Sequence, residues 1–167
     1  MTTRGNINYI AYTDGSYQSS INAGGWASII LDQNETLVVR LYQGMTDTTN
    51  NRMELRAVLE TLKYFEQPAN IHIVSDSMYV IGSITSGSAK KWIEENDLSK
   101  KNLDLWFQIV DLLEKHNVTF EWTKGHVGNK WNEEADKWCV FAAQCLNLPK
   151  DVWTINLQQK NLDNTGI

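Results

Sequence analysis

Residues 51–68 read NRMELRAVLETLKYFEQP, and this stretch decides the fold because the period of its apolar residues is that of a helix. Its apolar positions are Leu55, Val58, Leu59, Leu62 and Phe65. Residues at this spacing share one face of a helix, and a following proline ends such a pattern. The stretch therefore predicts one long amphipathic helix from Asn51 to the stop at Gln67-Pro68.

The segments before this helix have a different character. Residues 7–14, 24–31 and 36–42 are rich in β-branched and aromatic side chains and are separated by turn residues. Such segments are typical of strands, and short turns between them favour an antiparallel meander.

After the helix, strands and helices alternate. Residues 71–75 and 118–122 predict short strands, while residues 77–85, 103–113 and 131–145 show helical patterns. Three successive strands followed by this alternation predict an α/β fold. We expect a mixed five-stranded sheet, with three antiparallel strands and then parallel strands, covered by helices on both faces.

Length and composition favour one domain. A chain of 167 residues with 42% hydrophobic residues can bury its own core. We expect a domain of residues 1–148 and a frayed tail of residues 149–167, because the polar tail shows no clear period. A monomer is the default expectation, with a possible protein contact through the tail.

Cysteine usage and hydropathy limit the surroundings of the chain. Cys139 and Cys145 are six positions apart in a predicted helix, so they point to different faces and form no disulfide. No stretch of about 18 apolar residues predicts a membrane span. We therefore expect a soluble, cytoplasmic protein.

The net charge of −5 argues against a protein that grips nucleic acid by bulk electrostatics. Lysines gather in residues 88–102, but that segment has four positive and three negative charges and is barely basic. A site that binds divalent cations would gather carboxylates for its own reasons, so the objection is not decisive. Any nucleic-acid binding is expected to be modest.

Four acidic residues stand at the borders of predicted core elements. Asp14 ends the first predicted strand and Asp76 follows the strand of residues 71–75, while Glu54 and Asp136 border the apolar stripes of two helices. Each alone is explained more simply, as a turn residue, a helix cap, a dipole partner or a solvated position. Their joint placement is what suggests chemistry. Four carboxylates brought together by the sheet would need cations, and oxygen ligands suit Mg²⁺ or Mn²⁺.

Five motifs then occur in one order along the chain. They are Tyr12-Thr13-Asp14-Gly15-Ser16, Thr49-Asn50-Asn51-Arg52-Met53-Glu54-Leu55, Ser75-Asp76-Ser77, Lys124-Gly125-His126-Val127-Gly128 and Asn132-Glu133-Glu134-Ala135-Asp136. Together they resemble type 1 ribonuclease H, from about Ile7 to about Ala143, with the Asn-Asn-Arg-Met-Glu-Leu string the most specific part. The resemblance implies a ribonuclease H-like fold, with residues 1–148 as the catalytic domain.

The resemblance also implies an activity. It predicts an endonuclease that hydrolyses the RNA strand of an RNA/DNA hybrid with two metal ions, leaving 3′ hydroxyl and 5′ phosphate ends. Asp14 would bridge both ions, Asp136 would hold the ion that activates water, and Glu54 with Asp76 would hold the other. His126, in a glycine-flanked loop, would carry a proton or aid product release, although a surface loop histidine is the simpler interpretation of that residue alone.

Substrate contacts are likewise implied by the resemblance. The stretch before Glu54 would meet 2′ hydroxyls of the RNA and a phosphate of the DNA strand, although its short polar side chains could equally cap the helix. The expected substrate-binding residues are Thr49, Asn50, Asn51, Arg52, Lys90, Lys91, Trp92 and Lys124.

Two departures from the family pattern affect substrate binding. The basic protrusion common in bacterial members is reduced here to one tryptophan, Trp92, with lysines offset by acidic neighbours. The usual glycine- and proline-rich turn after the first Asp-Gly-Ser is replaced by residues 17–22. Two alternatives stay open: a non-catalytic hybrid-binding module, and a related nuclease of the same superfamily with another strand choice.

Overall fold

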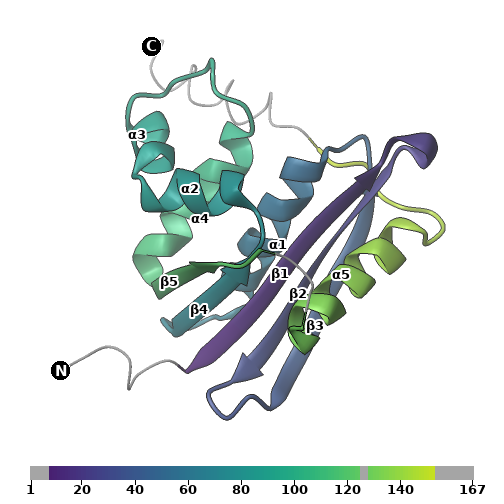
Figure 1. Cartoon of the computed structure of the whole chain (residues 1–167). Coiled ribbons are helices and arrows are strands. Elements are labelled where there is room, and N and C mark those ends of the chain that lie inside the picture. The colour runs from purple at the N-terminus through teal and green to yellow at the C-terminus, as the bar shows by residue number, and fades with distance from the viewer. Residues whose placement is uncertain (1–7, 125–127, 153–167) are drawn as a thin grey trace.

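A computed structural model of the chain describes residues 8–124 and 128–152, and it contains a five-stranded sheet (Figure 1). The strands are β1 (Tyr9–Gln18), β2 (Ala23–Asp32), β3 (Leu37–Thr46), β4 (Asn70–Ser75) and β5 (Asn117–Trp122). Their order is β3-β2-β1-β4-β5. The first three pair antiparallel, and β1, β4 and β5 pair parallel. The predicted mixed sheet is confirmed.

Helices connect and cover the strands. They are α1 (Asn50–Tyr64), α2 (Met78–Thr85), α3 (Ser88–Glu94), α4 (Leu103–Lys115) and α5 (Lys130–Ala143), with a short 3₁₀ turn η2 (Ser19–Ile21) between β1 and β2. Helix α3 is absent from the sequence-based expectation. Its seven residues offer too few turns for a helical period to be recognised, and its N-cap Gly87 reads as a break.

Alternation along the strands separates two cores. Ala11, Ile30 and Ile73 belong to a cluster with α1, whereas their neighbours Tyr12 and Val74 belong to another with α5. Successive residues of a strand point to opposite faces of a sheet. The expected helices on both faces are therefore present, and Figure 1 shows α5 and α1 on opposite sides of β1–β3.

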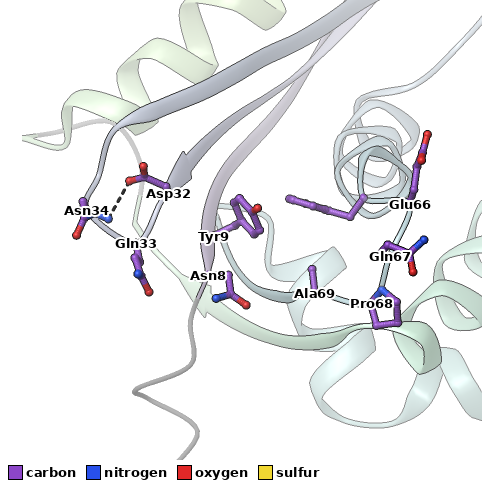
Figure 2. Close-up of a pocket in the computed structure, with 10 residues that line it drawn as sticks. Asn8, Tyr9, Asp32, Gln33, Asn34, Glu66, Gln67, Pro68 and Ala69 are labelled. Atoms are coloured by element: carbon purple, nitrogen blue, oxygen red, sulfur yellow. Dashed lines mark hydrogen bonds between the residues drawn. The ribbon is translucent and has the colours of Figure 1, made fainter.

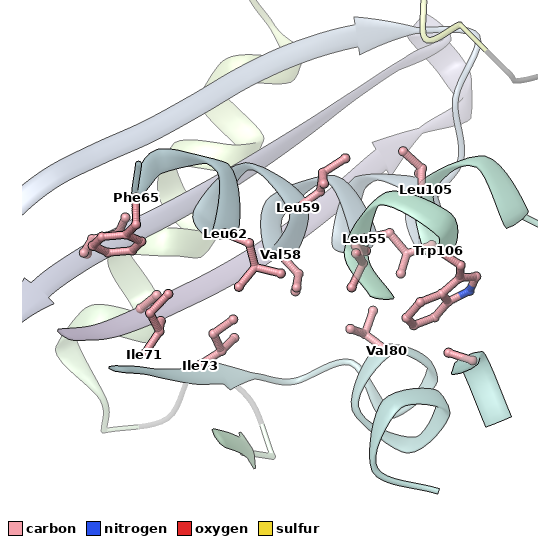
Figure 3. Packing of buried hydrophobic residues seen from close by; sticks show 14 residues of the cluster. Leu55, Val58, Leu59, Leu62, Phe65, Ile71, Ile73, Val80, Leu105 and Trp106 are labelled. Atoms are coloured by element: carbon pink, nitrogen blue, oxygen red, sulfur yellow. The ribbon is translucent and has the colours of Figure 1, made fainter. Parts of the chain in front are cut away.

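The larger core lies between α1 and the sheet. The predicted apolar stripe of α1 is buried there, as are Ile71 and Ile73 of β4 and the fully buried Trp106 of α4 (Figure 3). Tyr79 of α2 accepts a hydrogen bond at its hydroxyl from the Trp106 indole, at 3.0 Å. This core holds the first turns of α1 in a fixed place against β1.

The first strand is longer than expected, and this corrects the position of Asp14. β1 continues to Gln18, so Asp14 lies inside the strand, opposite Ala27 of β2. The sequence Asp14-Gly15 is typical of a turn, but ten consecutive pairs with β2 outweigh that local preference.

The expected tail also needs correction at its beginning. The backbone amide of Thr46 donates to Pro149 O, and that of Asp151 donates to Thr46 O, both at 2.9 Å. Asp151 is 3% exposed. A loosely packed tail is therefore wrong for residues 149–151, which lie against the end of β3; residues 153–167 lie outside the described part of the chain.

Within the described ranges, none of the helices has the length and apolar character needed to cross a bilayer.

The stability of the domain should depend on the stripe of α1. Leu62 is fully buried, so Leu62→Ala is expected to lower the free energy of unfolding by about 2–5 kcal/mol, from lost transfer energy and an unfilled cavity. Leu146 is 87% exposed, and the same change there should stay within about 0.5 kcal/mol. Urea unfolding of both variants measures the difference, and equal losses would contradict this account of the core.

Candidate active site

The site begins where two parallel strands separate. Pairing between β1 and β4 ends at Tyr12 and Val74. Asp14 and Asp76 each follow two residues later, beyond the last paired positions. Ligand sites of α/β sheets lie outside the carboxyl ends of parallel strands, where such divergence opens a crevice. The sheet thus brings two carboxylates to one opening.

Helix α1 contributes the third carboxylate. Thr49 is its N-cap, because the Thr49 hydroxyl accepts a hydrogen bond from the Arg52 amide at 3.1 Å. Glu54 follows in the second turn and is 5% exposed. The capping role of this stretch is confirmed for Thr49, and the cap fixes where Glu54 faces the sheet.

Helix α5 contributes the fourth. Its N-cap Asn129 accepts at its side-chain oxygen from the amides of Trp131 and Asn132. Asp136 lies two turns into this helix, beside the buried Ala135 that packs on β1, β2 and β4 residues.

Two glycines permit both helices to approach. A Cβ atom at Gly15 would lie within 3.0 Å of the Met53 and Glu54 backbone, and one at Gly25 would meet the Cys139 carbonyl oxygen. Real Cβ contacts are not that short. Because Gly15 and Gly25 are on adjacent strands, they set the positions of α1 and α5 relative to the sheet, and with them Glu54 and Asp136.

All four carboxylates line one open hollow of about 320 Å³. Ligand oxygens of Asp14, Glu54 and Asp76 lie within 4.8 Å of one another. A second group within the same spacing comprises Asp14, Asp136 and the Cys139 sulfur. Asp14 is therefore shared by both groups, and the convergence expected from the sequence is present.

This arrangement is electrostatically costly without a cation. Burial, and then repulsion from Asp76 and Asp136, raises the pKa of Asp14 to about 8. Burial and the charges of Asp14 and Asp76 raise the pKa of Glu54 well above its ordinary range. Desolvation and like charges both favour the protonated form, and a divalent cation would reverse this preference.

The donor set fits a hard cation. The Glu54 Oε2 atom is buried without a hydrogen-bond partner among the described residues, as expected of an oxygen meant for a ligand. Carboxylate oxygens are the ligands of divalent cations such as Mg²⁺ and Mn²⁺. The Cys139 thiol donates a hydrogen bond to the Asp136 carbonyl oxygen at 3.2 Å, and burial raises its pKa. Soft sulfur also suits Mg²⁺ and Mn²⁺ less well than carboxylate oxygen does.

The predicted substrate-binding residues of α1 separate into two kinds. Thr49, Asn50 and Asn51 are exposed, and Asn50 also lines the carboxylate hollow. Arg52 is fully buried. Its guanidinium forms ion pairs with Asp104 at 2.7 Å and Asp151 at 2.8 Å. A side chain without exposed surface cannot contact a substrate, so Arg52 is a structural residue and its predicted contact is wrong.

The other predicted contacts lie on α3 and after β5, and none lines the carboxylate hollow. Lys90 and Lys91 are exposed on α3 and lie 4.0 Å from Glu94 and Glu95, which confirms that the basic segment is diluted. Trp92 is half-buried, and its ring packs edge-on against Trp106. Lys124 is exposed just after β5. His126 lies outside the described residues.

A second hollow is no rival to this site. It measures about 450 Å³ and lies at the other end of the sheet, between the β2–β3 turn and the segment after α1 (Figure 2). One of its acidic residues, Asp32, already accepts hydrogen bonds from the Asn34 and Thr36 amides. Asp32 and Glu66 are the only carboxylates of its described lining, whereas ligand atoms of three acidic residues converge at the first hollow.

Sequence comparisons agree with the geometry. The model of the RNase H family matches residues 6–144. A ribonuclease H of Trichodesmium erythraeum is 40% identical over 146 residues, which cover 84% of this chain and 92% of that protein. A ribonuclease H of Ehrlichia canis is 41% identical over 132 residues, or 76% and 88% of the two chains.

Solved structures share the fold. One described as LC9-RNase H1, a type 1 RNase H with the type 2 active-site motif, has a TM-score of 0.73 at 23% identity, covering 92% of this chain and 80% of that one. A foamy viral protease-reverse transcriptase in complex with RNA/DNA hybrid has a TM-score of 0.70 at 22% identity, and the match covers 86% of this chain and 21% of that one.

Fold and site together define a class: an α/β protein with a cluster of carboxylates that could hold a metal ion at the carboxyl ends of parallel strands. The matched residues identify the member of that class. The chain belongs to the RNase H family.

The raised pKa of Asp14 predicts a pH-dependent effect on stability. Without metal, the folded state keeps a proton on Asp14 up to about pH 8, whereas the unfolded chain loses it near its ordinary pKa of 3.8. Wild-type stability should therefore fall as pH rises from about 4 to 8. Asp14→Asn removes this loss, so it should raise Tm in EDTA more at pH 9 than at pH 5.

The control is Asp111→Asn, which changes an exposed carboxylate on α4. It should shift Tm little, and similarly at both pH values. If Asp14→Asn changes Tm equally at pH 5 and pH 9, the pKa of Asp14 is not raised by burial and by its acidic neighbours.

Proposed function

We propose that the protein is an endonuclease that hydrolyses the RNA strand of RNA/DNA hybrids and leaves 3′ hydroxyl and 5′ phosphate ends. One observation carries the proposal: in a chain of the RNase H family, Asp14, Glu54, Asp76 and Asp136 converge on one hollow. A catalytically silent relative would have no need to keep four mutually repelling carboxylates together.

The carboxylates would hold Mg²⁺, with Mn²⁺ as a possible substitute. Asp14 belongs to both groups of closely spaced ligand atoms, which supports a role as the shared ligand of two ions, with Glu54 and Asp76 on one side and Asp136 on the other. When bound, the ions would neutralise the charge that develops on the attacking and leaving oxygens. The protein's own part is to hold the carboxylate oxygens of these four residues on rigid elements before the substrate binds.

Substrate choice would depend on the start of α1. Asn50 lines the carboxylate hollow and Asn51 is exposed next to it. Amide side chains can both donate to and accept from a hydroxyl. Beside the carboxylates, the two asparagines would contact 2′ hydroxyls in the minor groove of the hybrid. These hydroxyls distinguish RNA from DNA, and no base is read.

Affinity for the hybrid should be modest. Lys90 and Lys91 have acidic partners one turn away, and the chain has a net charge of −5. Few phosphates would then be neutralised, so the dependence of binding on salt should be shallow. His126 would act as a proton carrier or product-release residue near this site, as the family motif around it suggests.

Cleavage of labelled duplexes tests the proposal. Incubation of end-labelled RNA/DNA hybrid, duplex RNA and duplex DNA with Mg²⁺ should give internal cuts in the hybrid's RNA strand only, and EDTA should prevent them. Asp14→Asn should lower the rate at least about 100-fold while sparing binding, because several kcal/mol of charge stabilisation is lost.

Asp111→Asn removes one exposed carboxylate that does not line the hollow, and this variant should cleave like the wild type. Hybrid that is bound but left intact by the wild-type protein would favour a non-catalytic binding module. Equal cutting of duplex DNA would instead favour a related nuclease with another strand choice.

A further inference from the structure

Asp151 links several side chains through one carboxylate. Its carboxylate accepts hydrogen bonds from the Thr48 hydroxyl and Arg52 Nε, both at 2.8 Å. It also accepts from Arg56 at 2.9 Å, and its side chain is fully buried. A fourth hydrogen bond comes from Arg52 Nη2 at 3.2 Å. A carboxylate has about four lone-pair positions, so little capacity remains for any other partner.

These partners are spaced along one side of α1. Thr48 precedes the N-cap by one residue, and Arg52 and Arg56 follow at intervals of four, so that all three face the same direction. Asp151 therefore joins the loop before α1 to the first two turns of the helix. A single carboxylate thus contacts the loop, through Thr48, and both arginines of the helix.

The backbone around Asp151 strengthens this attachment. Residues 149 and 151 pair with Thr46 at the end of β3, and Lys150 lies 3.8 Å from Asp47. Asp47 has a positive φ of 54°, a conformation that costs energy for a residue with a side chain. The segment of residues 149–151 thus braces the loop of residues 47–49 from outside the helix (Figure 1).

A second carboxylate that contacts Arg52, that of Asp104, has a different role. Asp104 of α4 accepts two hydrogen bonds from the Arg52 guanidinium, at 2.9 and 2.7 Å. A buried arginine needs such compensation. Among the described residues, the Asp104 carboxylate forms no hydrogen bond with Thr48 or Arg56, so it neutralises Arg52 without bracing the loop.

The contacts of Asp151 hold the first two turns of α1, which carry residues of the candidate active site. Asn50 and Asn51 come directly after the N-cap, and Glu54 lies between Arg52 and Arg56 on the same two turns. We propose that Asp151 is a positioning residue, which holds the start of α1 in the geometry that hybrid cleavage needs. The inference rests on the proposed function, and it assigns a role to a residue beyond the family match of residues 6–144.

Full-length Asp151→Asn, assayed well below its Tm, tests the role. It should raise KM for hybrid by about 10- to 100-fold, the scale expected when binding groups shift by about 1 Å. Amide hydrogen exchange of residues 47–52 should become faster. Asp151→Glu, which keeps the charge, should restore part of both properties.

Asp104→Asn is the matched control because it removes one carboxylate from the same arginine. It should lower Tm as Asp151→Asn does, yet leave KM near the wild-type value. Thr48→Val removes only the hydroxyl link and should raise KM with a smaller change in Tm.

The outcomes are separable. If Asp151→Asn and Asp104→Asn lower Tm alike and neither changes KM or exchange of residues 47–52, Asp151 is merely structural and the inference is overturned. If the wild-type protein cuts no hybrid, the proposed function fails instead, and the exchange measurement still decides whether Asp151 braces the loop.

Discussion

The structure depends on holding mutually repelling carboxylates within one small hollow. Asp14 and Glu54 are almost entirely buried, and one carboxylate oxygen of each lies within 4.8 Å of the other and of an oxygen of Asp76. Desolvation and like charge both oppose this arrangement, so it persists only where rigid elements impose it. The cost is consistent with a site whose favourable partner is a cation, since the same features that raise the pKa of Asp14 would strengthen its attraction to a metal ion.

Close packing of two helices against the sheet brings the carboxylates together. Gly15 admits the backbone of α1, and Gly25 admits that of α5, so two helices on opposite faces of the sheet reach the same crevice. The core then keeps them there, because the apolar stripe of α1 and Ala135 of α5 pack against alternate residues of the same strands. Burial of apolar surface is the largest favourable contribution to folding, and here it also opposes the repulsion in the site.

Helix α1 connects the core, the site and Asp151. One face carries the buried stripe, Glu54 faces the hollow, and Arg52 is buried between Asp104 and Asp151. Placing an arginine in the interior is expensive unless its charge is compensated, and two carboxylates from distant segments provide that here. The consequence is that the C-terminal segment contributes to the geometry at the start of α1.

The sequence by itself determined the five strands, the three long helices and the identity of the four carboxylates, because each has a local periodic or motif signal. Tertiary structure alone decided the rest. β1 passes through Asp14 because β2 pairs with it, and Arg52 is buried because Asp151, 99 residues away, accepts its hydrogen bonds. Periodicity reports which face of an element is apolar. Which distant charge or strand meets that element depends on how the chain packs, and no local pattern records it.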